Sequence, residues 1–265
     1  MNKEFNLAVV QCEFKPKEVN YNLLKIEQIV QNCKFKYPNI RLIVFPELAT
    51  TGYILDKTTS LLSQSSEGSD FQRLSIIAKE TNIYIVYGYV ERDEEGKIYN
   101  SIQLIGPDGV SIANYRKIHL TPMEHGIFEA GREIVAIETD IGKIGLMICW
   151  DLAFPELARI LALQGVDLLV VPSAWEDPYS DAYEKFSIAR AIDNTVFLAT
   201  SNHIGTSGPL HFFGKSSIYG PDGKLLISGE AYKEEVHVTK IDITNRTTLK
   251  NEFFSMLEER RTDLY

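Results

Sequence analysis

Apolar residues along this chain follow two alternating patterns, which predict strands and helices in turn. Short apolar runs of the kind found in buried strands alternate with segments whose apolar residues recur every three or four positions, as on one face of a helix. This alternation predicts an α/β layered fold. The predicted helices cover residues 18–34, 71–78, 154–163 and 182–192. The predicted strands cover residues 7–12, 41–45, 83–90, 134–137, 143–149, 167–171 and 196–200.

Two further pairs of strands are predicted around a repeated turn. The tetrapeptide GPDG occurs at residues 106–109 and again at 220–223, each time between two strand-like segments. Two α/β halves with a hairpin each indicate an internal pseudo-repeat, although GPDG is also favourable turn chemistry in any context. No linker rich in Pro, Gly or Ser divides the chain, so we expect a single domain over residues 1–265. Residues 56–69 and 118–132 are expected to be loops.

Composition narrows the class of protein without naming it. The chain has 265 residues and a net charge of −9, which argues against nonspecific binding to nucleic acid or to an anionic membrane. Its three cysteines, Cys12, Cys33 and Cys149, include no CxxC pair, which argues against a disulfide framework or a zinc ribbon. The N-terminus has no signal-peptide pattern and no apolar run is long enough for a membrane span, so we expect a cytoplasmic protein.

Cys149 is the strongest candidate for chemistry. It ends an apolar run and precedes the helix predicted from residue 154, so it lies near unpaired backbone N–H groups. Such groups favour the thiolate, which is the nucleophilic form of cysteine. The alternative is a buried structural cysteine, which is what we expect Cys12 and Cys33 to be.

Two charged residues also follow predicted strands. Glu47 is a candidate general base, because burial in an apolar cleft raises the pKa of a carboxyl group, and a loop carboxylate in solvent is its alternative. Lys117 could stabilise a thiolate and an oxyanion, and a solvated lysine is its alternative. Sites in α/β folds gather beyond the carboxyl ends of strands. The hypothesis is therefore a Glu47–Lys117–Cys149 hydrolase site, with the backbone N–H of Trp150 as a second oxyanion donor.

Three motifs around these residues resemble those of the nitrilase superfamily of carbon–nitrogen hydrolases. They are FPELATTGY at residues 45–53, YRKIHL at 115–120 and GLMICWD at 145–151, the last followed by FPE at 154–156. The resemblance continues over nearly the whole chain, through residues 8–11, 189–194, 202–205, 214–223 and 260–265. It implies a four-layer α-β-β-α sandwich with an internal pseudo-twofold, which favours the repeat interpretation of the two hairpins. It also implies a homodimer or larger homo-oligomer, with a C-terminal tail of about residues 244–265 contributing to dimer contacts.

The resemblance further implies a mechanism without metal or organic cofactor. Cys149 would attack an amide carbonyl, Lys117 and the Trp150 N–H would hold the oxyanion, and Glu47 would carry protons by way of a thioester. The second glutamate of the family best matches Glu124, seven residues before Gly131, and its competitor is Glu129. The sequence departs from the family at residue 130, an alanine where many members have proline.

The substrate is left open among small linear amides, ω-amides of keto acids, N-carbamoyl compounds and nitriles, with a small amide favoured. Trp150 and Trp175 are expected to line the pocket, although Trp175 could equally be a core residue. Tyr53, His125 and Asn202 are further candidates for substrate contact. No arginine is an evident clamp for a substrate carboxylate.

Two other classes of protein compete with this hypothesis. A Cys–His hydrolase could use one of five histidines, but none lies in a papain-like or caspase-like motif, and no pair has HxH or HExxH metal spacing. P-loop, GxGxxG and GxSxG motifs do not occur. A noncatalytic relative that binds a ligand or partner is the rival from another class. The histidines are His119, His125, His203, His211 and His237.

Overall fold

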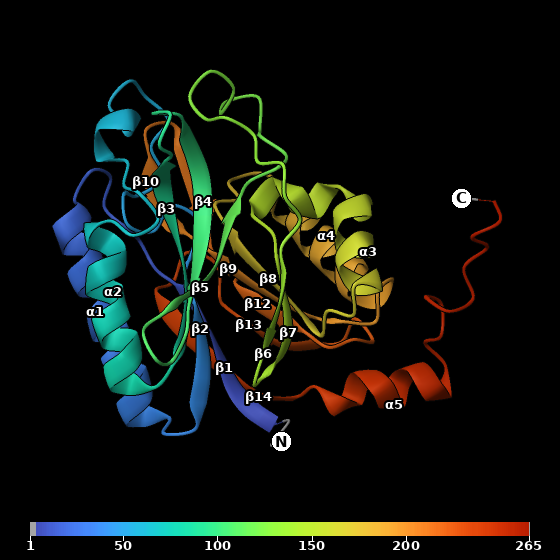
Figure 1. Ribbon diagram of the computed structural model, residues 1–265. Coiled ribbons are helices and arrows are strands. Elements are labelled where there is room, and N and C mark those ends of the chain that lie inside the picture. Colours follow the sequence, from blue (N-terminus) through green and yellow to red (C-terminus); the bar gives the residue numbers. More distant parts are fainter. Residues whose placement is uncertain (1–3, 265) are drawn as a thin grey trace.

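The computed structural model describes residues 4–264, and these form two six-stranded sheets with helices on the outer side of each (Figure 1). Residues 1–3, at the start of the chain, and Tyr265, the last residue of the expected tail, lie outside the described residues. The elements before residue 120 are β1 (Glu4–Gln11), α1 (Val19–Lys36), β2 (Ile40–Val44), η1 (Thr59–Leu62), α2 (Ser69–Thr81), β3 (Tyr84–Arg92), β4 (Ile98–Ile105) and β5 (Ser111–Arg116).

A second set of elements follows with the same kinds of strand and helix. These are β6 (Ala136–Thr139), β7 (Gly142–Leu146), η2 (Cys149–Ala153), α3 (Pro155–Leu163), β8 (Leu168–Ser173), α4 (Ser180–Ile192), β9 (Phe197–Asn202), β10 (Ile204–Ser207), β11 (Leu210–Phe213), β12 (Ser217–Tyr219), β13 (Leu225–Ser228), β14 (Glu235–Asp242) and α5 (Thr244–Glu252).

The two sheets repeat one topology. The first has the order β14-β1-β2-β3-β4-β5 and the second, read in the matching direction, β6-β7-β8-β9-β12-β13. In each sheet three parallel strands are flanked by an antiparallel hairpin on one side and a single antiparallel strand on the other. Both hairpins turn at a GPDG sequence. The pseudo-repeat interpretation is therefore confirmed.

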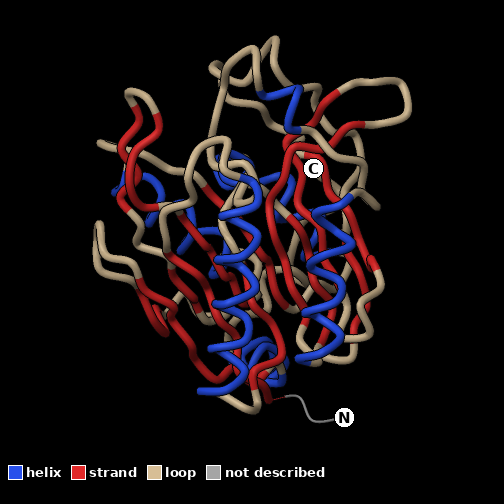
Figure 2. Tube along the Cα trace, turned by 90° about the vertical axis from the view of Figure 1, so that its left-hand side faces the viewer, coloured by secondary structure: helices blue, strands red, loops and turns tan. Residues whose placement is uncertain are grey.

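Helices cover the outer face of each sheet, which makes the four layers. Helices α1 and α2 lie on one side of the molecule and α3 and α4 on the other (Figure 1), and the side view shows the first pair in front of its strands (Figure 2). The apolar stripe predicted for residues 18–34 is buried, through Leu23, Ile26, Val30 and Cys33. The largest core cluster contains apolar residues of both sheets together with residues of α3 and α4 that pack on the second sheet.

Three strands and one helix were not expected from the sequence. The largest omission is β14, which pairs antiparallel with all of β1 over residues 4–11. Its sequence, EVHVTKID, carries charged residues on an edge strand, so its apolar run is too weak to stand out. The others are the hairpin β10–β11 and helix α5, and the predicted loop at 56–69 contains the short helix η1.

The strand predicted over residues 143–149 is shorter than expected. Strand β7 ends at Leu146, and Cys149 begins the 3₁₀ helix η2 instead of closing the strand. The next helix starts at Pro155, where a proline is favourable because the first helical N–H has no partner in the helix.

The C-terminal segment projects from the body of the molecule (Figure 1). Helix α5 is anchored by buried Arg246, which donates to the carbonyl oxygen of Thr195 at 2.9 Å and pairs with Asp167 at 3.2 Å. Beyond it the chain continues with exposed apolar residues such as Phe253 and Leu264. The expectation that this tail contributes to dimer contacts stays a prediction.

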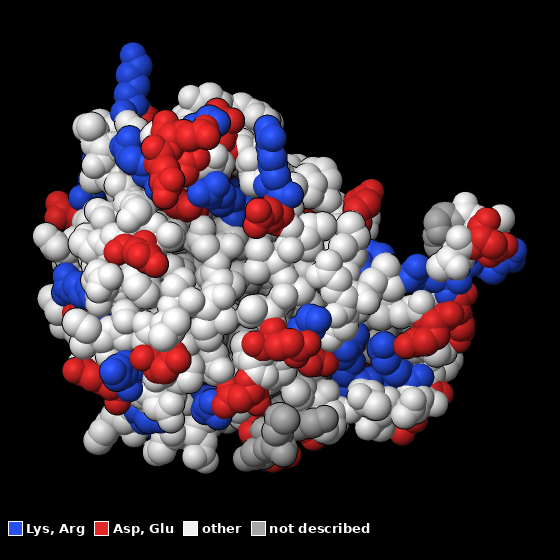
Figure 3. Space-filling model, in the orientation of Figure 1, with Lys and Arg blue, Asp and Glu red and all other residues white. Residues whose placement is uncertain are grey.

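Charge is distributed without a single dominant patch on the face in Figure 3, where groups of Lys and Arg lie beside groups of Asp and Glu. Within residues 4–264 no helix combines the length and apolar character that crossing a bilayer requires.

Candidate active site

Three strand ends bring the predicted residues together between the two sheets. Glu47 lies three residues beyond β2, Lys117 directly follows β5, and Cys149 lies three residues beyond β7. The side chains of Glu47 and Lys117 are fully buried, and Cys149 is 5% exposed. The solvated alternatives for Glu47 and Lys117 are therefore wrong.

Lys117 is held by two carboxylates. Its Nζ donates to Glu47 Oε1 at 2.7 Å and to Glu124 Oε2 at 2.8 Å. Asn100 Nδ2 joins the same two carboxylates, at 2.6 Å from Glu47 Oε1 and 2.7 Å from Glu124 Oε1. The other oxygen of Glu47, Oε2, has no hydrogen-bond partner within the described chain. One ammonium is thus shared by two carboxylates, and one carboxylate oxygen is left available.

The two carboxylates are given different protonation behaviour by their surroundings. Burial raises the pKa of Glu47 above its ordinary value, against the opposing effect of Lys117. Burial acts the same way on Glu124, but its contacts with Lys117 and with the Thr121 N–H outweigh it and hold the pKa of Glu124 below its ordinary value. Both carboxylates together keep the pKa of Lys117 well above its ordinary value despite burial. Carboxyl groups with pKa values driven apart are suited to different roles.

Burial disfavours the thiolate form of Cys149. Burial raises the pKa of the Cys149 thiol well above its ordinary value and the Glu47 charge adds to this, while Lys117 and a hydrogen bond from the backbone of Ala174 oppose it. This direction is opposite to the expectation that nearby N–H groups favour the thiolate, because burial outweighs both Lys117 and the backbone hydrogen bond. A base must take the thiol proton during the reaction.

The turn that carries Cys149 has a strained backbone. Cys149 has φ of 45°, in the left-handed region that a residue with a side chain rarely adopts. Asp151 fastens this turn, because its carboxylate accepts from the Ile148 N–H at 2.9 Å and from the Tyr115 hydroxyl at 2.7 Å. The same carboxylate contacts His119 Nδ1 at 2.7 Å. Asp151 therefore joins the cysteine turn to the strand that delivers Lys117.

Cys149 lies in the wall of a mostly apolar cavity of about 570 Å³. Tyr53, Trp150 and Trp175 line it, as predicted. The remaining lining residues are Thr121, Pro122, Met123, Ala174, Glu176, Tyr179, Ala182 and Phe186.

Two predicted substrate contacts are not part of this cavity wall. His125 is exposed on the loop after Glu124 and does not line the cavity. Asn202 is buried behind it, where its amide accepts from the Trp175 N–H at 2.8 Å and donates to the Trp175 carbonyl oxygen at 3.1 Å. Asn202 thus positions Trp175. Of the two candidate second glutamates, Glu124 reaches Lys117, whereas Glu129 is exposed.

Sequence reasoning missed Asn100, Asp151 and Gly88 as parts of the site. Asn100 stands in a strand whose pattern gives no hint of chemistry, and Asp151 was quoted only within its motif. Gly88 on β3 has no room for a Cβ, which would lie 2.2 Å from the Leu48 nitrogen and 2.8 Å from the Glu47 Cα. The backbone after β2 therefore packs directly on β3, and this close approach fixes Glu47.

The histidines do not offer a base to the cysteine. His203 donates from Nε2 to the backbone carbonyl oxygen of Glu47 at 2.6 Å, and burial lowers the pKa of His203 to about 4. His119 bonds Asp151, and no histidine hydrogen-bonds the Cys149 sulfur in the part of the chain that the structure describes. Across residues 4–264 no group of three His, Cys, Asp or Glu side chains is placed to hold a metal ion.

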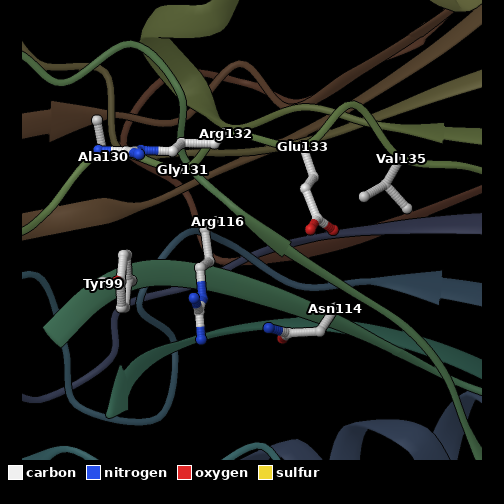
Figure 4. Close-up of a pocket in the computed structure, with 8 residues that line it drawn as sticks. All are labelled: Tyr99, Asn114, Arg116, Ala130, Gly131, Arg132, Glu133 and Val135. Carbon is white, nitrogen blue, oxygen red and sulfur yellow. The ribbon is translucent and has the colours of Figure 1, made fainter. Parts of the chain in front are cut away.

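A second hollow, of about 440 Å³, lies beside the strand that carries Lys117 (Figure 4). Figure 4 shows Arg116 of β5 between Tyr99 and Asn114, with residues 130–135 passing across. Arg116 lies 3.9 Å from the Tyr99 ring centroid and pairs with Glu91 at 2.6 Å. Its charge is balanced there, and among the described residues no cysteine lines this hollow, whose lining carboxylate Glu133 is exposed.

Comparisons with known proteins agree with this geometry. The family model described as carbon-nitrogen hydrolase matches residues 6–251. A probable nitrilase of Schizosaccharomyces pombe is 40% identical over 98% of this chain and 97% of that protein. A 2-oxoglutaramate amidase of Bacillus subtilis is 31% identical over 99% of this chain and 100% of that protein. The chain therefore belongs to the carbon–nitrogen hydrolase family of the nitrilase superfamily.

The fold comparison supports the same assignment. A crystal structure of a carbon-nitrogen hydrolase from Helicobacter pylori matches with a TM-score of 0.93 at 25% identity, over 100% of this chain and 97% of that one. An amidase from Nesterenkonia sp. matches with a TM-score of 0.87 at 25% identity, over 98% and 94%. The predicted nitrilase-like α/β fold is confirmed.

Proposed function

We propose that this chain is an amidase that cleaves the C–N bond of a small linear carboxamide and releases ammonia. One observation carries the proposal: a buried ammonium shared by two carboxylates, one with a free oxygen, adjoins a cysteine in the wall of an apolar cavity. The amidase name of a relative covering nearly the whole chain supports it.

The first half of the proposed reaction forms a thioester. Glu47 accepts the thiol proton as the Cys149 sulfur attacks the amide carbonyl carbon. The negative charge that develops on the carbonyl oxygen is stabilised by Lys117 and by the backbone N–H of Trp150. Glu47 then gives its proton to the amide nitrogen, the C–N bond breaks, and ammonia leaves.

The second half releases the acid. Glu47 takes a proton from water, the resulting hydroxide attacks the thioester carbon, and the C–S bond breaks. The sulfur recovers its proton from Glu47, which restores the resting thiol. Glu124 stays ionised throughout, because its low pKa makes it the permanent counter-ion of Lys117. Glu47 has the raised pKa that a proton carrier near neutral pH requires.

Ammonia release from a panel of substrates tests this function. Linear amides, ω-amides of keto acids, N-carbamoyl amino acids and nitriles would be supplied to the wild type and to Cys149→Ala. We expect release from the amides, and no release in the variant, whose fold would be checked by circular dichroism. Hydrolysis by a folded Cys149→Ala protein would contradict the mechanism.

Two alternatives use the same residues on another substrate. Nitrile hydrolysis is favoured by the probable-nitrilase name of the relative at 40% identity, and cleavage of an N-carbamoyl group would need the same nucleophile and base. The panel separates them, because each predicts release from its own class of compound and not from simple amides.

The remaining alternative is a noncatalytic binding protein. Iodoacetamide distinguishes it, because Glu47 can take the proton of Cys149 during alkylation, whereas Cys12 is buried with a pKa raised far above its ordinary value. An enzyme should therefore be labelled at Cys149 well before Cys12, as peptide mass spectrometry would show. Slow labelling of Cys149, together with no ammonia from any compound, would favour the noncatalytic protein.

A further inference from the structure

One carboxylate interrupts the apolar wall of the cavity that contains Cys149. Glu176 follows Trp175 directly and lines this cavity together with Trp150, Tyr179 and Phe186. Its backbone is fixed by a bridge to Phe212 of β11 and by the Tyr179 N–H, which donates to the Glu176 carbonyl oxygen at 3.0 Å. Glu176 therefore stands on an ordered wall of the cavity.

The Glu176 carboxylate has no cationic partner. It is half-buried, and within residues 4–264 it makes no ion pair and no hydrogen bond with another side chain. Among the residues that the structure describes, no Lys, Arg or His lines the cavity. The cation that most affects it is Lys117, which is already held by Glu47 and Glu124. Burial raises the pKa of Glu176, and a hydrogen bond from its own backbone N–H opposes this.

The carboxylate of the next residue, Asp177, differs from that of Glu176 in exposure, hydrogen bonding and position. Asp177 is exposed, does not line the cavity, and accepts a hydrogen bond from the Tyr232 hydroxyl at 3.0 Å. Of these two adjacent carboxylates, only Glu176 faces a space that a substrate could fill. Asp177 is therefore a matched control for its charge.

An unpartnered carboxylate in an apolar wall selects among ligands by charge. A ligand cation beside it would replace the hydration that burial removes, whereas a ligand carboxylate would add like-charge repulsion in a partly desolvated space. Specificity of this kind comes as much from weaker binding of the anionic ligand as from stronger binding of the cationic one.

We propose that Glu176 is a cation subsite, so that the preferred substrate is an amide with an apolar acyl chain ending in an ammonium group. This inference rests on the proposed amidase function and specifies its substrate class. It also sets the chain apart from the relative named for 2-oxoglutaramate, because that compound carries a carboxylate. Amides with an anionic acyl end would be poor substrates.

Matched amides that differ only in end group test the subsite. A longer set consists of ε-aminocaproamide, caproamide and adipic acid monoamide, and a shorter set of γ-aminobutyramide, butyramide and succinamic acid. In the wild type we expect kcat/KM for the cationic amide to exceed that for the anionic amide by at least about tenfold in one set. Glu176→Gln should reduce this ratio toward one, while Asp177→Asn should leave it unchanged.

Binding to Cys149→Ala protein provides a readout that does not need turnover. Calorimetry would compare ε-aminocaproamide with adipic acid monoamide, with and without Glu176→Gln. Preference for the cation that disappears with Glu176→Gln would support the subsite even if no amide were hydrolysed, in which case only the proposed function fails. Equal binding of both compounds, or a preference that survives Glu176→Gln, would overturn the subsite while leaving amide hydrolysis untouched.

Discussion

The two halves of this chain share a topology but contribute different chemistry. Strand β1 leads to Cys12 and strand β7 leads to Cys149, and the registers with β2 and β8 make these two cysteines equivalent. Each half also has a proline just before a polar residue, Glu47 in the first and Ser173 in the second. The cluster around Cys149, made by Glu47, Asn100 and Lys117, therefore has a counterpart around Cys12.

The counterpart lacks the residues that match Glu47, Asn100 and Lys117. Counted from the two GPDG turns, Lys117 corresponds to Ala231 and Asn100 to Gly214, and these two counterparts form a bridge at the matching place. The Gln11 side chain fills the space there, since a Cβ on Gly214 would lie 2.5 Å from its Cδ.

The difference teaches which part of the site the fold supplies. The internal repeat places a cysteine, a turn after a proline and the end of a hairpin around both Cys12 and Cys149. The fold itself therefore determines where these groups lie. The proposed mechanism draws on a lysine and two carboxylates that lie beside Cys149. Burial raises the pKa of both Cys12 and Cys149, so the two places differ in the base and the cation beside the thiol and not in the direction of its pKa shift.

The largest effect should come from making the reactive cluster resemble its counterpart. Lys117→Ala introduces the residue found at position 231, and it removes the oxyanion partner while leaving Glu47 and Glu124 facing each other. We expect kcat to fall by about a thousandfold or more, and Glu47→Gln to lose activity on a similar scale. Arg116→Ala, the neighbouring cation in the second hollow, is the control and should retain most activity. Near-normal turnover by Lys117→Ala would remove Lys117 from the mechanism.

A smaller effect is expected from the strand that supports Glu47. Gly88 on β3 matches Ser201 on β9, where a side chain is tolerated. Gly88→Ala would push the backbone at Glu47 and Leu48 away, and we expect kcat to drop by about ten- to a hundredfold. Ser201→Ala is the matched change in the other half and should alter kcat little. If both variants fold and have the same kcat, the close approach at Gly88 does not position the base.

The smallest effect concerns stability in acid. His203 is buried and neutral, with a pKa of about 4 against 6.5 in the unfolded chain. Between these values the unfolded chain binds more protons, so stability is full above pH 6.5 and falls as the pH drops toward 4. The loss should be about 3 kcal/mol at most. Urea unfolding between pH 4 and 6.5 would measure this loss. The free energy of unfolding should depend less on pH in His203→Gln, whereas His211→Gln, at an exposed position, should keep the pH dependence of the wild type.

Many strands and helices of this fold could be predicted from the sequence, because each has a recognisable local pattern of apolar residues. Buried strands such as β8 are continuous apolar runs, and α1 has a regular apolar stripe, so both were recognised. Strand β14 could not be, because its stability comes from pairing with β1 at the far end of the sequence. Pairing between distant segments leaves little local signal.

The candidate site divides in the same way. Glu47, Lys117, Glu124 and Cys149 were found through their motifs, and the structure brings the first three into direct contact. Asn100 acts only through its position between two carboxylates, which no pattern in its own strand reveals. The direction of the Cys149 pKa shift could not be read from the motif, because it comes mainly from burial, which is a property of the packed site.

The site also has a consequence in time. Glu47, Asn100, Lys117 and Glu124 all precede β6, whereas Cys149 follows β7. Neither half of the chain holds a complete set of reacting groups, so a nascent or partly folded chain carries an inert thiol and an isolated charge cluster. The proposed activity can begin only when the two sheets have closed on each other, so turnover would show that this step has taken place.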